Sequence, residues 1–212
     1  MLSRVLSYAV DPLGKIGANP CEGIKRLYST DRSEIIWTDG DIVQLKKTCR
    51  PEVGWAIDLA AHTGLRESDL LRLCWSHVRP EERAIVLSTG KSRERREAYI
   101  PLYDALRAVL TAIPKRGPMI LTNSRGRPWT RNGFGTAINR AKRAAALQDR
   151  DLHFHDLRGT AATRFYAAGI PERVIAEIMG WEEEHVRKII RRYVGRAAAT
   201  KALIRQPNEK RT

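Results

Sequence analysis

The segment "HDLRGTAATRFYAAG", residues 155–169, places His155 and Arg158 one helical turn apart. Side chains three residues apart on a helix are neighbours, with Cβ atoms about 5–6 Å apart, so both could contact one phosphate-sized anion. Like charges this close repel, and an anion between them would relieve the repulsion. A solvated basic helix face is the alternative interpretation, and this segment alone does not separate the two.

Three other positions carry donors for an anionic oxygen. Arg66 follows the turn at Thr63-Gly64, Lys91 lies between two predicted strands, and Trp181 follows Gly180. Guanidinium, ammonium and indole N–H groups all donate to phosphate oxygens. Taken singly, such residues are more often solvated cations or core aromatics. Only their convergence would define a site.

A candidate nucleophile, Tyr193, lies within the apolar stripe of the last strongly predicted helix, at 182–194. The spacing of 3.6 residues per turn makes a core aromatic the plainer interpretation. However, a phenol with an ordinary pKa near 10 becomes a useful nucleophile only beside cations, and the same helix is crowded with them. The stripe comprises Val186, Ile189, Ile190 and Val194, and the cations are Arg187, Lys188, Arg191 and Arg192.

The charge of the chain favours a polyanionic partner. Its 212 residues hold 38 Lys plus Arg against 24 Asp plus Glu, a formal net charge of +14. Nucleic acid is the leading partner, and an anionic membrane surface is second. The sequence has neither the roughly 18–20 apolar residues that span a bilayer nor a secretion signal, which predicts a cytoplasmic protein.

Metal, nucleotide and disulfide chemistry find little support. Cys21, Cys49 and Cys74 are far apart and form no CxxC pair, which argues against zinc and against a disulfide framework. "TGKS" at 89–92 lacks the upstream glycine of a phosphate loop, because that position holds Ile85. We expect neither a cofactor nor a metal.

Hydrophobic periodicity predicts a mostly helical α+β domain with a small antiparallel sheet. Strands are expected at 83–88 and 96–102, forming a hairpin around a basic tip at 90–96. Helices are expected after Thr38 or Asp39, through 52–62, at 66–73, 102–112 and 131–147, from His155 to Gly169, from Pro171 to Gly180, and at 182–194. Cations on the hairpin tip and on the alanine-rich helix are candidate DNA contacts: Arg93, Arg95, Arg96, Lys142 and Arg143.

Taken together, these residues resemble the tyrosine recombinases, also called phage integrases. "TGLRESDLLRL" at 63–73 looks like the first arginine box of that family, and "HDLRGTAATRFYAAG" resembles its His-x-x-Arg box. The family's series of arginine, hairpin lysine, His-x-x-Arg, histidine or tryptophan, and tyrosine is similar to this chain over about residues 33–200. In order, the corresponding residues are Arg66, Lys91, His155, Arg158, Trp181 and Tyr193.

The resemblance implies the catalytic-domain fold of the family and its reaction. Tyr193 would attack a DNA phosphodiester, leaving a 3′-phosphotyrosyl link and a free 5′-hydroxyl. Arg66, Arg158 and Trp181 would hold the phosphate oxygens, Lys91 would protonate the leaving 5′-oxygen, and His155 would assist proton transfer or orient the phosphate. Asp69, one turn after Arg66, would support that arginine.

Two features depart from the commonest family pattern. Most relatives have histidine where this chain has Trp181, and an indole can donate a hydrogen bond but cannot shuttle a proton. His185 is an alternative for that histidine, although it falls inside the predicted helix. The interval from Trp181 to Tyr193 is also about one helical turn longer than is usual.

The resemblance also implies a domain organisation. Residues 1–30 look like the last helix and linker of a truncated N-terminal DNA-binding domain, 31–206 would be the catalytic domain, and 207–212 a frayed end. Double-stranded DNA is the expected partner, with self-association, as a tetramer on DNA in the full-length protein.

Three other functions remain open. The first is a non-catalytic helix-turn-helix DNA reader, although its recognition helix would begin with the acidic Glu182, Glu183 and Glu184. The second is a type IB topoisomerase, which uses similar chemistry without a particular site. The third is an inactive integrase that keeps only the fold.

Overall fold

The structure is a computed structural model that describes residues 2–24, 32, 35–89 and 96–193. The chain divides into two compact units, Met1–Asp31 and Arg32–Thr212. In the first unit, helix α1 (Leu2–Val10) buries none of its residues. The Asn19 side chain folds back on this helix, donating to the Ser3 carbonyl at 2.9 Å and to Ser7 Oγ at 2.8 Å.

The second unit begins with an antiparallel pair of helices, α2 (Asp39–Thr48) and α3 (Pro51–Thr63). Of the two predicted caps, Thr38 and Asp39, it is Thr38 that caps α2, in a reciprocal capping box with Asp41. Helix α3 starts with proline at its first position and ends at Gly64, whose φ of 63° is left-handed. Its middle is buried on nearly all sides, so α3 is a central element of the core.

A three-stranded antiparallel sheet follows, in the order β1-β2-β3. Strands β2 (Ala84–Thr89) and β3 (Arg96–Pro101) form the predicted hairpin, with Ile85 opposite Ile100. The short edge strand β1 (Val78–Arg79) was not predicted, because two residues carry no readable alternation. Short turns of helix, α4 (Glu67–Leu70) and η1 (Trp75–His77), precede the sheet, and α5 (Asp104–Ala112) follows it.

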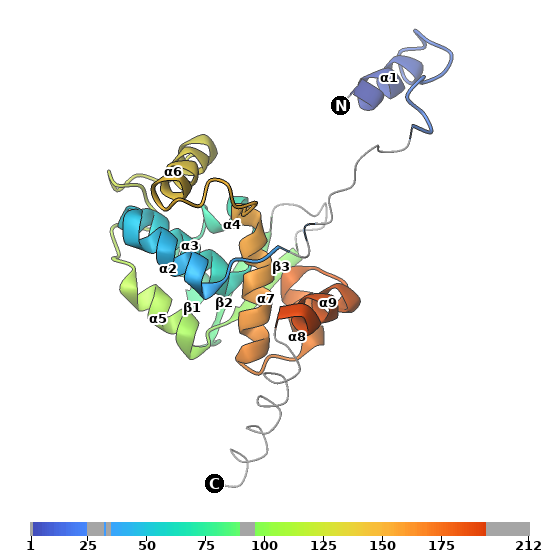
Figure 1. Ribbon diagram of the computed structural model, residues 1–212. Coiled ribbons are helices and arrows are strands. Elements are labelled where there is room, and N and C mark those ends of the chain that lie inside the picture. Colours follow the sequence, from blue (N-terminus) through green and yellow to red (C-terminus); the bar gives the residue numbers. More distant parts are fainter. Residues whose placement is uncertain (1, 25–31, 33–34, 90–95, 194–212) are drawn as a thin grey trace. The chain divides into compact units, whose positions relative to one another are not determined.

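The C-terminal half holds the remaining helices. They are α6 (Arg131–Ala144), the 3-10 turn η2 (Phe154–Asp156), α7 (Leu157–Ala167), α8 (Glu172–Met179) and α9 (Glu183–Tyr193). Figure 1 shows α7 running between the α2–α3 pair and the α8–α9 pair. Because α7 packs on both sides, its small residues Ala161 and Ala162 are fully buried.

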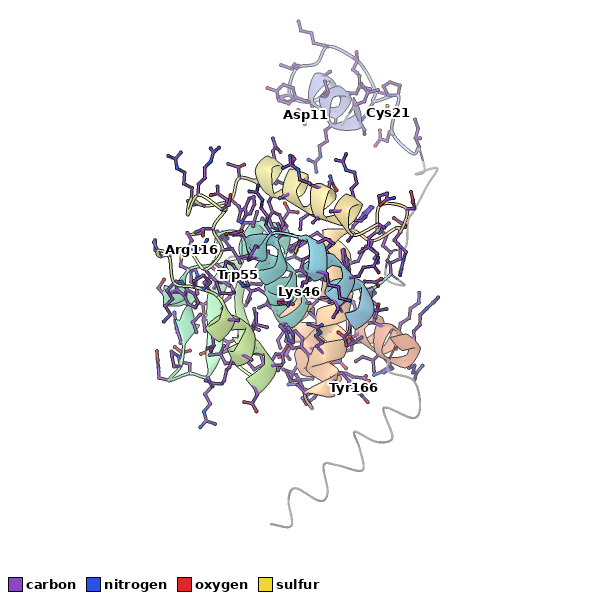
Figure 2. All side chains as sticks on the ribbon, turned by 60° about the vertical axis from the view of Figure 1, so that its left-hand side comes forward. Asp11, Cys21, Lys46, Trp55, Arg116 and Tyr166 are labelled. Atoms are coloured by element: carbon purple, nitrogen blue, oxygen red, sulfur yellow. The ribbon has the colours of Figure 1, made fainter. Side chains whose placement is uncertain are left out.

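Outside the core, cation–π contacts hold loops onto helices. The Arg116 guanidinium lies 5.3 Å from the centre of the Trp55 ring on α3, and the two side chains lie close together in Figure 2. Arg116 also pairs with Glu52 at 2.9 Å, so the segment after α5 is held on the start of α3.

The predicted fold class, mostly helical with a small antiparallel sheet, is confirmed, but several boundaries move. The helix expected at 66–73 is only the single turn α4, and α6 stops at Ala144, just before Ala146 takes a left-handed φ of 51°. Val174, placed on the apolar face of its helix by its spacing, is 37% exposed. No helix among the described residues is long and apolar enough to cross a membrane.

Candidate active site

Arg158 is the buried centre of the candidate site. It is only 5% exposed, and its guanidinium donates from Nη1 to the carbonyl of Gly64 and from Nη2 to the carbonyl of Met179. Those carbonyls lie at the C-terminal ends of α3 and α8, where the helix dipole is negative and carbonyls lack helical partners. Arg158 therefore joins three helices, and the C-terminal ends of two of them stabilise its charge.

A second cation acts on this guanidinium. Burial and, to a smaller extent, the positive charge of Arg66 together lower the pKa of Arg158 to about 10, although the charge of Asp69 partly opposes them. Arg66 is half-buried at the residue preceding α4, just after the Gly64 turn. Because the positive charges of Arg66 and Arg158 repel each other, an anion bound between the two guanidinium groups would be stabilised by both.

Trp181 covers the Arg158 guanidinium. The Arg158 carbon Cζ lies 5.1 Å from the centre of the indole ring, within cation–π range. Gly180 directs the chain here with a left-handed φ of 62°, and the Trp181 backbone N–H donates to the Ala176 carbonyl at 3.0 Å. The predicted convergence of Trp181 with Arg158 is thus present in the geometry.

His185 also contacts the indole of Trp181. Its ring meets Trp181 edge to face, with 4.7 Å between ring centres, from the first turn of α9. The His185 side chain is half-buried, and the indole that it contacts is the one that covers Arg158. This contact keeps His185 open as the alternative for the histidine role.

His155 is exposed beside Arg158, but not on the same regular helix. It lies in the 3-10 turn η2, and α7 begins only at Leu157. The expectation that His155 opens the helix is therefore wrong by two residues. Asp156 accounts for the turn, because its carboxylate accepts a hydrogen bond from the His153 backbone N–H at 2.6 Å.

Gly64 permits the close packing that the site needs. A Cβ built on this residue would lie 2.9 Å from Met179 Cε, closer still to Met179 Sδ, and 3.3 Å from Ala161 Cβ. Together with its left-handed φ of 63°, this approach means that a side chain here would have to displace the thioether end of Met179. Glycine here lets the ends of α3 and α8 share Arg158.

Asp69 is buried and pairs with Arg72 at 3.0 Å. Its charge also favours the charged form of Arg158. The predicted support of Arg66 by Asp69 stays a prediction.

Arg131, which the sequence did not single out, reaches from the start of α6 to Glu67 beside Arg66, at 3.7 Å. No spacing rule relates residues from two such distant segments.

Several predicted residues lie outside what the structure describes. Lys91, Arg93 and Arg95 belong to the hairpin tip outside the described residues, and Arg96 is placed only as a backbone position in β3. Tyr193 is the last residue of α9, and only its backbone is described. The approach of its hydroxyl to the arginines therefore stays a prediction.

The two candidate DNA contacts on α6 differ in environment. Lys142 is half-buried and donates from Nζ to the carbonyls of Leu152 at 2.6 Å and Arg150 at 3.3 Å, which ties α6 to the loop before η2. Arg143 is exposed on the same helix. Neither environment tests DNA contact.

Across the described parts of the chain, no three His, Cys, Asp or Glu side chains gather as metal ligands would.

The chain belongs to the phage integrase family, whose sequence pattern it matches over residues 38–199. It is 26% identical over 157 residues to the integrase of Salmonella phage P22, covering 68% of this chain and 39% of that protein. It is 28% identical over 174 residues to a shufflon-specific DNA recombinase of Escherichia coli, covering 80% of this chain and 42% of that protein. The chain thus spans about two fifths of the length of these relatives.

The fold is also found among solved structures. A lambda integrase dimer bound to a COC′ core site superposes with a TM-score of 0.66 at 20% identity, covering 89% of this chain and 56% of that one. At this identity the likeness concerns the fold.

Proposed function

We propose that this chain carries the catalytic unit of a site-specific DNA recombinase that cuts and rejoins strands through a 3′-phosphotyrosyl intermediate. The observation that carries the proposal is Arg158, a buried guanidinium held by two helix ends, repelled by Arg66 and covered by Trp181. These groups come from three separate segments of a chain in the phage integrase family. Their convergence supports an anion-binding role better than a scatter of surface cations does.

In the proposed reaction, Tyr193 Oη forms a bond to phosphorus while the bond from phosphorus to the 5′-oxygen breaks. The tyrosine proton leaves to His155 or to solvent, and Lys91 supplies a proton to the departing 5′-oxygen. A 5′-hydroxyl from another strand then attacks the phosphotyrosyl link and releases the tyrosine. One phosphoester replaces another at each step, so the exchange needs no energy source.

The size of the barrier explains why several donors are needed. Enzymes lower reaction barriers by about 8–23 kcal/mol, whereas one preorganised oxyanion donor supplies about 2.7–4 kcal/mol. Arg66 and Arg158 together would neutralise the charge that builds on the non-bridging oxygens, and their planar forks match that geometry. The Trp181 indole would add one further donor.

The assembly and location of the protein follow from the same proposal. Residues 1–30 would be the end of a DNA-binding domain and 31–206 the catalytic domain, whereas the expectation for 207–212 lies outside the described residues. Arg93, Arg95, Arg96, Lys142 and Arg143 would contact the duplex. Self-association on DNA is expected, because the likeness includes a lambda integrase dimer on its core site. We place the protein in the cytoplasm.

The test uses a library of nicked duplexes with randomised sequence. A nick close to the scissile phosphate releases a short fragment, which leaves the protein trapped covalently on the longer piece. The proposal predicts an adduct that survives detergent with the wild-type chain and none with Tyr193→Phe, and sequencing the trapped DNA would give the preferred site. DNA binding without any adduct would favour a non-catalytic reader. Relaxation of a supercoiled plasmid without sequence preference, measured in parallel, would favour a topoisomerase.

A further inference from the structure

Arg32, the first residue of the second unit, donates five hydrogen bonds to two aspartates near the candidate site. Its Nε and Nη2 donate to the two oxygens of Asp156 at 3.2 and 2.7 Å. Its Nη1 donates to both carboxylate oxygens of Asp151 at 2.9 Å, and Nη2 also donates to the Asp151 carbonyl at 2.9 Å. One planar guanidinium therefore bridges two carboxylates and a backbone carbonyl.

The inner partner of Arg32 is a buried charge next to the site. The Asp156 side chain is 1% exposed, against 66% for Asp151. A carboxylate so deeply buried needs a compensating cation, because its desolvation is costly. Asp156 lies between His155 and the start of α7, and two residues before Arg158. Arg32 thus neutralises the Asp156 carboxylate, which in turn holds the turn that carries His155 by accepting the hydrogen bond from the His153 backbone N–H.

Residues 35–37 pack along the same turn and helix. The Trp37 indole donates to the His153 carbonyl at 2.8 Å, and the Trp37 backbone exchanges hydrogen bonds with the Thr160 hydroxyl at 2.9 Å each. At Gly159 a Cβ would come within 2.6 Å of Ile36 Cγ2, so this segment lies tightly against α7. Arg32 is the first of several contacts that fix the beginning of α7 from outside.

We infer that Arg32 is a positioning residue for the strand-cleavage reaction: its bridge to Asp156 holds the turn that carries His155 and Arg158 in the geometry needed for cleavage. This inference rests on the proposed function. Arg32 touches neither DNA nor the reacting atoms in this scheme, and acts through Asp156. Because Arg32 begins the second unit, it also fixes where the chain enters that unit relative to the candidate site.

The chain offers a matched control in Arg164. Arg164 lies on α7, and its side chain is 20% exposed against 22% for Arg32. It pairs at 2.7 Å with Asp39, the first residue of α2. Asp39 is 88% exposed, so the Arg164 pair, unlike the Arg32 pair, holds no buried carboxylate. Arg164→Gln removes a similar ion pair from the other end of α7.

The experiment compares Arg32→Gln, Arg32→Lys and Arg164→Gln in the full chain. The substrate is a nicked duplex that carries the preferred site recovered from the random library. Lysine keeps a positive charge for Asp156 but cannot bridge both carboxylates, so it remains informative where the glutamine variant is poorly folded. Adduct formation is measured at saturating DNA, well below all melting temperatures, and DNA affinity is measured separately. Hydrogen exchange of the amides at 153–158 is followed without DNA.

The inference predicts that Arg32→Gln slows adduct formation about tenfold to a hundredfold at unchanged DNA affinity, with Arg32→Lys intermediate and Arg164→Gln near wild type. Amide exchange at 153–158 should become at least about tenfold faster in Arg32→Gln only. A wild-type cleavage rate in Arg32→Gln, or an equal loss in Arg164→Gln, would overturn the inference. If the wild-type chain forms no adduct, the proposed function fails, and unchanged exchange in Arg32→Gln would still refute the bridge by itself.

Discussion

Two glycines with nearly the same left-handed φ allow the packing around Arg158 to be measured. Gly64 and Gly180 end α3 and α8 with φ of 63° and 62°. A Cβ on Gly64 would collide with Met179, whereas a Cβ on Gly180 would meet nothing within 4 Å. The Gly180→Ala variant therefore reports the cost of a left-handed alanine alone, and Gly64→Ala reports a similar backbone cost plus the collision.

The expected difference follows from these contributions. A left-handed alanine costs roughly 1–2 kcal/mol, and the reduced entropy of the unfolded chain returns about 0.4–1 kcal/mol in both variants. Forcing a methyl group into a packed site adds about 1–3 kcal/mol. Gly64→Ala should therefore lower the free energy of unfolding by about 1–3 kcal/mol more than Gly180→Ala does.

Urea unfolding of the two variants and the wild type measures this difference directly. Because Met179 supplies one of the two carbonyls that hold Arg158, Gly64→Ala should also slow adduct formation more than Gly180→Ala does. Equal destabilisation by the two variants would show that Met179 moves aside at no cost. The close approach of α3 and α8 would then not be what fixes Arg158.

Three further predictions concern single side chains. Arg158→Lys should lower the free energy of unfolding in urea by about 1.5–3 kcal/mol, because one ammonium cannot replace both charged hydrogen bonds of the guanidinium; no change would contradict the bridged geometry. Burial lowers the pKa of His62 from 6.5 to about 4, so the unfolded chain takes up the proton first and the melting temperature should fall as pH drops from 6.5 towards 4. His62→Gln should flatten that dependence, and an equally steep profile would rule out His62 as its source. Lys91→Ala should slow cleavage of ordinary DNA but not of DNA with sulfur in place of the leaving 5′-oxygen, because a thiolate leaves without a proton; equal slowing would remove Lys91 as the acid.

The sequence predicts well those elements that carry local chemistry. The capping box at Thr38, the left-handed exits at Gly64 and Gly180, and the hairpin of β2 and β3 all follow from residue types at fixed spacings. The acidic start of α9 is likewise readable, because Glu183 and Glu184 suit a helix N-terminus.

Long-range partners could not be predicted in the same way. The helix-end carbonyls that hold Arg158 are backbone groups. Because every residue carries such a carbonyl, the residue types do not reveal which carbonyls will bind the arginine. The bridge from Arg32 to Asp156 joins residues 124 positions apart, and no periodicity relates them. The 3-10 turn at His155 depends on that same carboxylate, which is why the predicted helix began two residues early.

The most direct test of the central claim is to find where DNA becomes attached. The trapped adduct is digested with nuclease and trypsin, and the remaining nucleotide is located by mass spectrometry. We expect a nucleotide carried through its 3′-phosphate on the peptide that begins at Tyr193, after cleavage at Arg192. A nucleotide on any other tyrosine, or a 5′-phosphate linkage at Tyr193, would contradict it.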